Sequence, residues 1–144
     1  MKRFAFLTAA ILLCMLSCRE PSSVENFVKG AEGPYSFDVD MSDSTRTYDI
    51  WIYTRTDSRP ALVKDVSGIP LDITWTSPGG KAFSETVYMP LRDSVRHFFY
   101  SSETSRPYRT GVVPIEPGIW IMEASIPDSA RIKGFRGLGV RVKH

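Results

Sequence analysis

The sequence predicts an all-β domain, an antiparallel β-sandwich of seven or eight strands with immunoglobulin-like or jelly-roll-like topology. Three observations support this prediction. From residue 35 onward, apolar side chains alternate with polar ones at a period of two. Short runs of this kind are separated by turns rich in Gly, Pro, Asp and Ser. No long segment shows the 3.6-residue period of an amphipathic helix. With 144 residues, the chain has room for one such domain.

Two early segments carry the clearest alternation. Residues 35–41 form the first expected strand, because every second side chain is apolar. Residues 47–54 form the strongest one, with Tyr48, Ile50 and Ile52 on one face. We therefore expect these three side chains in the core. Residues 55–68 read as irregular chain.

The later strands are expected at a regular spacing, over residues 71–75, 81–89, 95–101, 108–115, 119–126 and 138–142. The first two of these are joined by Ser77-Pro78-Gly79-Gly80. Proline presets its φ angle and the glycines accept positive φ, so this segment predicts a hairpin turn. Trp75 and Trp120 lie in apolar strands and are expected in the core.

Residues 1–17 are typical of a lipoprotein signal peptide. A basic start is followed by an apolar run that is shorter than the roughly 20 residues of a membrane-spanning helix. Met15-Leu16-Ser17-Cys18 then resembles a lipobox, which predicts cleavage before Cys18 and acyl chains on its thiol and amine. Each buried CH₂ contributes roughly 0.8 kcal/mol to membrane binding. A permanent transmembrane helix and an ordinary secretory signal are the alternatives.

Residues 18–34 then predict an acylated cysteine and a flexible tether, followed by the β-sandwich domain over residues 35–144. Arg19 resembles the non-aspartate residues that let lipoproteins reach the outer membrane. We therefore expect a lipid-anchored protein of the cell envelope, most simply on the outer membrane. The sequence leaves open whether it faces the periplasm or the exterior.

Charge and cysteine content exclude several function classes. The chain has 18 basic and 16 acidic residues, and without Lys2 and Arg3 the two signs balance, which argues against nucleic acid as a partner. Cys14 and Cys18 are the only cysteines, so the domain holds no disulfide framework and no thiolate metal site. No cofactor and no metal are expected. A calcium site at Asp38, Asp40 and Asp43 is the minor alternative to a solvated strand face.

Three residues are the candidate binding site for a partner protein or a glycan. Asp49, Trp51 and Tyr53 share the face of residues 47–54 that is opposite Ile50 and Ile52. Exposed aromatic side chains there would stack on sugar rings or anchor a protein interface. The alternative is that Trp51 is buried under a loop. No catalytic residues are assigned, and His97 as a general base is a weak third hypothesis, of a hydrolase.

Charge is distributed unevenly along the chain. No acidic residue follows Asp128, whereas basic residues continue to the end, and acids are dense from Asp38 to Asp49. Either the last strand forms a basic patch, or the first and last strands are neighbours and neutralise each other. The second alternative is favoured.

Several sequence segments together resemble the GldH-type gliding-motility lipoproteins of Bacteroidetes. The matching segments are residues 48–55, 73–80, 117–120 and the closing strand Leu138-Gly139-Val140-Arg141-Val142-Lys143, and the resemblance covers most of residues 35–143. It implies a β-rich domain behind a lipobox, without assigned enzymatic activity. We therefore expect a non-enzymatic accessory or structural lipoprotein that binds an envelope protein complex for gliding motility or secretion. A carbohydrate-binding lipoprotein module is the alternative.

Overall fold

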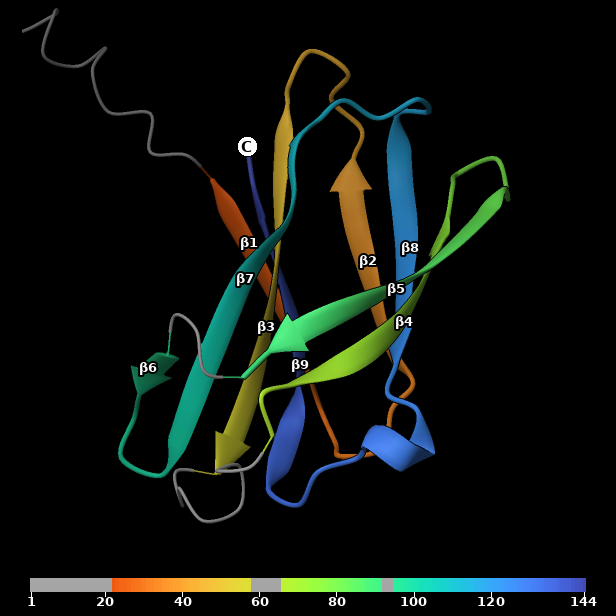
Figure 1. Ribbon diagram of the computed structural model, residues 1–144. Coiled ribbons are helices and arrows are strands. Elements are labelled where there is room, and N and C mark those ends of the chain that lie inside the picture. The colour runs from red at the N-terminus through yellow and green to blue at the C-terminus, as the bar shows by residue number, and fades with distance from the viewer. Residues whose placement is uncertain (1–21, 58–65, 92–94) are drawn as a thin grey trace, which may run out of the picture.

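The computed structural model describes residues 22–57, 66–91 and 95–144 and has an all-β fold (Figure 1). The described residues form nine strands: β1 (Ser23–Lys29), β2 (Tyr35–Met41), β3 (Tyr48–Asp57), β4 (Gly68–Thr76), β5 (Ala82–Pro90), β6 (Val95–His97), β7 (Ser101–Val112), β8 (Gly118–Ser125) and β9 (Phe135–Lys143). A single turn of 3₁₀ helix, Asp128–Ala130, precedes β9. In the described part of the chain, no helix is long and apolar enough to cross a bilayer.

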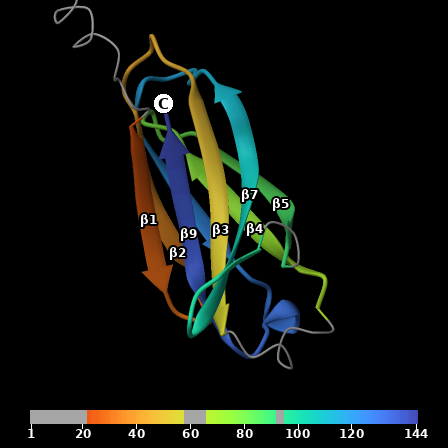
Figure 2. The same cartoon turned by 90° about the vertical axis from the view of Figure 1, so that its left-hand side faces the viewer.

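The strands form two antiparallel sheets packed as a sandwich, as predicted. One sheet has the order β1-β9-β3-β7-β6 and the other β2-β8-β4-β5. Figure 2 shows β1, β9, β3 and β7 side by side in one layer, with the second sheet behind. In most of the strands, alternate side chains face the other sheet, and together they form one core. Residues expected in that core are buried there, including Tyr48, Ile50, Ile52, Trp75 and Trp120.

The domain starts earlier than the sequence predicts. Residues 23–29 were assigned to the tether, but they form β1, which pairs along its whole length with β9. Most β1 side chains are exposed, so the strand lacks the alternation that sequence reasoning depends on. Main-chain hydrogen bonds to a neighbour far along the chain hold it in place. The sandwich therefore begins at residue 23 rather than at residue 35.

The middle of the chain also differs from the prediction. Strands were expected over residues 95–101 and 108–115, whereas β6 has three residues and β7 runs unbroken from Ser101 to Val112. Polar residues and Pro107 interrupt the apolar alternation over β7, so the sequence does not predict it as one strand. Its pairing with β3, which extends to Asp57, overrides the weak local propensity.

Candidate functional site

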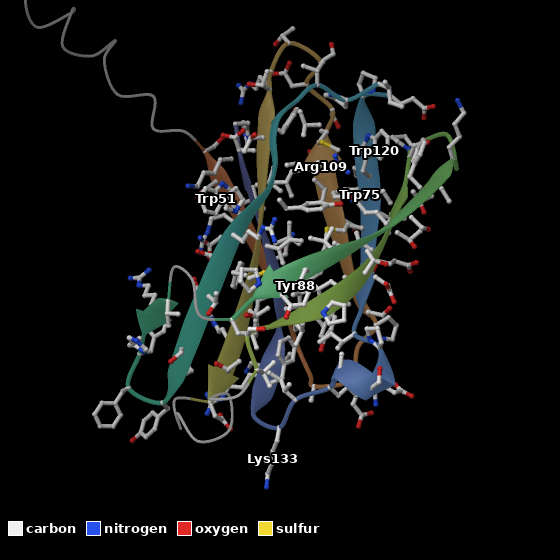
Figure 3. All side chains as sticks on the ribbon, viewed as in Figure 1. Trp51, Trp75, Tyr88, Arg109, Trp120 and Lys133 are labelled. Carbon is white, nitrogen blue, oxygen red and sulfur yellow. The ribbon has the colours of Figure 1, made fainter. Side chains whose placement is uncertain are left out.

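The three residues predicted as a binding site lie on the outer face of the five-stranded sheet. Asp49, Trp51 and Tyr53 alternate along β3 with the core residues, as the sequence predicts. Figure 3 shows Trp51 on this face. Asp49 accepts a hydrogen bond through Oδ1 from the backbone N–H of Gly111, 2.8 Å away, and so fixes the end of β7. Trp51 is half-buried, and the ammonium of Lys143 lies 5.0 Å from its ring centroid. Both residues therefore have structural partners.

Tyr53 does not form an exposed platform with Trp51. Its side chain is only 1% exposed. It lies across Gly139 of β9 and stacks on Phe27 of β1, with the ring centroids 5.8 Å apart and the planes at 16°. Because Phe27 covers it, Tyr53 has no free face for a sugar ring. The sequence prediction overlooked this contact because it placed Phe27 in the tether.

Charged side chains close over this aromatic pair. Arg141 forms ion pairs with Glu25 of β1 and, at 3.4 Å, with Glu103 of β7. Arg55 pairs with Glu103 at 3.2 Å, and its guanidinium lies 4.7 Å from the Phe27 ring centroid. We call these six residues, Glu25, Phe27, Tyr53, Arg55, Glu103 and Arg141, the outer cluster. It ties four neighbouring strands together, which indicates a structural role.

The charge asymmetry of the sequence is largely balanced in the fold. The last strand lies between β1 and β3, so that Arg141 reaches Glu25 and Arg136 reaches Asp57. The favoured alternative placed the first expected strand, residues 35–41, beside the last one, and it is wrong: these residues form β2, which pairs with β8 in the other sheet. Arg131 pairs locally, with Asp128.

The other candidate residues that the structure describes, His97, Asp40 and Asp43, lie at exposed positions. The Nδ1 atom of His97 lies 3.1 Å from the Ser102 hydroxyl on the exposed β6–β7 hairpin. Asp40 and Asp43 accept hydrogen bonds from residues two positions ahead of each, as in Asx turns. No group of three metal-ligating side chains occurs among the residues that the structure describes. Cys18, the predicted lipidation site, lies outside the described residues.

A cavity between the two sheets is the site that sequence reasoning missed. It has a volume of about 350 Å³, and both sheets line it. Its walls are mainly apolar, with Trp75, Phe83 and Trp120 as the aromatic ones. Figure 3 shows Trp75, Trp120 and Arg109 where β5 and β7 diverge. Trp75 and Trp120 meet edge to face with centroids 6.5 Å apart, so the walls are firmly packed.

A chain of hydrogen bonds forms the polar side of this cavity. Trp75 donates through Nε1 to the Tyr108 hydroxyl at 2.9 Å, and Tyr108 donates to Oε1 of Glu85. Arg109 donates to the same carboxylate oxygen at 2.7 Å. Trp75 and Glu85 belong to one sheet, and Tyr108 and Arg109 belong to the other. These hydrogen bonds therefore link the two sheets beside the cavity.

The titration of Glu85 reflects this environment. Its partial burial would raise the pKa of the carboxyl group, but hydrogen bonds from Tyr108 and Arg109 outweigh that effect and lower the pKa below the ordinary 4.5. Burial and the bond to Glu85 raise the pKa of Tyr108, which keeps its hydroxyl protonated as a donor. Near neutral pH, the Glu85 carboxyl group of the folded protein is therefore ionised rather than protonated.

Replacing Glu85 by glutamine should therefore destabilise the domain in a pH-dependent way. A carboxylate with a depressed pKa contributes stability above its unfolded pKa and loses it as the pH falls through the folded value. We expect a loss of about 1 kcal/mol at pH 7, reduced because the pair is partly exposed, and almost none at pH 3. Urea unfolding of both proteins between pH 7 and pH 3 measures the difference. If the difference in the free energy of unfolding between the two proteins stayed constant across this range, the stabilising role of the ionised Glu85 carboxylate would be contradicted.

Comparison with known proteins adds no relative: no family model, curated protein or solved structure matches this chain.

Proposed function

We propose that the protein is a non-enzymatic lipoprotein of the cell envelope, held on the outer membrane by acyl chains on Cys18. In this proposal it is an accessory component that binds an envelope protein complex through the mouth of the inter-sheet cavity. The resemblance to the GldH-type lipoproteins suggests a complex for gliding motility or secretion. The carbohydrate-binding alternative loses its main support, because Tyr53 is covered by Phe27.

The observation that carries the proposal is exposed apolar surface around the cavity. Three of its lining residues are largely open to solvent: Phe83 is 47% exposed, Val113 62% and Ile115 75%. Soluble monomers rarely leave apolar side chains clustered around an apolar hollow, and such patches mark interaction sites. Well-packed pockets with aromatic walls are also where interface hot spots concentrate.

The position of the cavity suits a partner close to the membrane. Strand pairing aligns Ser23 with Lys143, Lys143 with Asp49, and Tyr48 with Val112. The start of β1 and the end of β7 therefore lie at the same end of the five-stranded sheet (Figure 1). Three residues lie between Cys18 and Ser22, so four Cα-to-Cα steps give a reach of at most about 15 Å. A lipid on Cys18 would hold the cavity end of the domain near the bilayer.

Site-directed photocrosslinking in cells tests this proposal. We expect a crosslinker at Ile115 to form an adduct with a protein of an envelope complex. A crosslinker at Lys133, which is exposed at the other end of the domain (Figure 3), should not form it. Identical adducts at both positions, or none at Ile115, would contradict the docking surface.

The anchor is tested separately by Cys18→Ser. Removal of the thiol should abolish acylation, so the protein should move from the membrane fraction to the soluble fraction, or remain uncleaved with its leader. Palmitate labelling and cell fractionation measure this. Loss of motility or secretion in the same strain would support the accessory role, whereas membrane-bound, cleaved Cys18→Ser protein would refute the lipid anchor.

A further inference from the structure

The sandwich is incomplete beside the cavity. Within the described residues, β5 pairs only with β4, and β7 beyond Thr104 pairs only with β3. The two strands approach where Arg106 donates to the backbone carbonyl of Tyr88, and they diverge from there (Figure 1). Near the start of β5, the inner-face side chain of Phe83 remains 47% exposed, whereas Glu85 further along the same face reaches β7.

The polar side of the opening has groups that match a peptide bond. Glu85 uses Oε1 for both of its hydrogen bonds, and its Oε2 accepts none within the described part of the chain. Arg109 donates to Glu85 through one nitrogen, Nη2, and its guanidinium carries further N–H donors. One free acceptor beside free donors complements a backbone amide, which presents one N–H and one C=O.

We propose that this cavity binds an extended peptide segment of the partner protein. A large apolar side chain of that segment, aromatic or branched, fills the space above Trp75 and Trp120, and the neighbouring main-chain amide bonds to Glu85 and Arg109. The inference rests on the proposed function and specifies what its docking site recognises. A segment between two strands with free edges is extended rather than helical, since only extended chain can continue the pairing of a sheet.

The same geometry disfavours a fatty acyl chain as the occupant. An acyl chain offers no donor to Oε2 of Glu85. A fatty-acid carboxylate that used the remaining donors of Arg109 would lie beside the ionised Glu85 carboxylate, which is 2.7 Å from the same guanidinium, and the like charges would repel. A volume of about 350 Å³ is at the lower end of the roughly 300–1,000 Å³ typical of ligand pockets, and suits a side chain.

The three tryptophans allow a direct test. Trp75 and Trp120 line the cavity, whereas Trp51 lies on the outer face of the other sheet and is the internal control. Full-length protein labelled with 5-fluorotryptophan is purified from membranes, placed in lipid nanodiscs and titrated with N-acetylphenylalanine methylamide. The ¹⁹F signals of Trp75 and Trp120 should shift saturably with a Kd of about 1 mM, while that of Trp51 stays in place.

Matched probes and one variant sharpen the result. N-acetylalanine methylamide, which has the amide but no large side chain, should bind at least about tenfold more weakly. Arg109→Gln should weaken the phenylalanine probe by about fivefold, with the Trp51 signal reporting an intact fold. Octanoate should cause no saturable shift.

Several outcomes would overturn the inference. Saturable shifts with octanoate alone would identify a lipid site, equal shifts at all three tryptophans would mean nonspecific binding, and no shift would mean no site. If the Ile115 adduct forms in cells but the peptide probes fail, the peptide inference falls and the proposed function stands. If the probes bind but no adduct forms, the cavity is a peptide site whose partner is not an envelope complex.

Discussion

Replacing Gly139 by alanine should destabilise the domain by about 3 kcal/mol, although alanine is intrinsically the better residue in a strand. Local preference alone would favour alanine by roughly 0.5–1 kcal/mol. However, a Cβ at this position would overlap the ring of Tyr53, which lies flat against the glycine. The ring cannot move away easily, because Phe27 stacks on its other face. The steric cost of overpacking should therefore exceed the gain from the strand preference of alanine. Urea unfolding would measure the net loss in the free energy of unfolding.

A double-mutant cycle with Tyr53→Ala separates this contact from other effects. Without the ring, the three closest contacts of the new methyl group disappear, so Gly139→Ala in that background should cost less than about 1 kcal/mol. Gly111→Ala is a useful comparison, because Gly111 has a φ of +64° but open space around it. It should cost only the backbone strain, about 1–2 kcal/mol. Equal stability of the wild type and Gly139→Ala would refute the packing argument.

The same contact explains what the sequence could and could not predict. Alternation along β3 correctly predicted that Ile50 and Ile52 face the core, because a period of two is a local property. It could not predict that Tyr53 is buried on the opposite face. That burial depends on Phe27, whose strand lies two positions away in the sheet and more than 20 residues away in the chain.

Strands held mainly by their neighbours were the ones predicted least well. The polar half of β7 carries Glu103 and Thr104, which are buried although such residues usually mark loops. Glu103 is acceptable there because Arg55 and Arg141 neutralise it. By contrast, β4 and β5 carry regular apolar residues and a well-defined turn. The prediction for β5 is within one residue at each end, whereas β4 begins at Gly68, three residues before the expected start.

The inter-sheet cavity was not predictable because its parts are distant in sequence. Trp75 and Trp120 were correctly expected in the core, but a core position does not reveal an opening beside it. Glu85 and Arg109 come from different sheets and meet only when the sandwich closes. One signal was present: the apolar Val113-Pro114-Ile115 segment follows a strand without a polar turn. A contiguous group of exposed apolar residues marks an interaction surface.

Replacing Arg141 by methionine should cost about 3 kcal/mol, because it leaves a buried carboxylate with one partner fewer. Arg141 contacts Glu25 and Glu103 at once, and the side chain of Glu103 is only 6% exposed. Methionine keeps much of the apolar stem over Tyr53 but removes the charge. Loss of one member of a buried ion pair typically costs about 3–5 kcal/mol, and the remaining bond from Arg55 should hold the cost near the lower limit.

Two further variants decide whether charge is the cause. Adding Glu103→Gln to Arg141→Met should recover at least about 1 kcal/mol, because the unpaired charge disappears with its partner. Arg131→Met removes an arginine whose partner Asp128 is largely solvated, so it should change the free energy of unfolding very little. If the double variant were no more stable than Arg141→Met, the loss would come from packing. The outer cluster would then be held by its aromatic stack rather than by its charges.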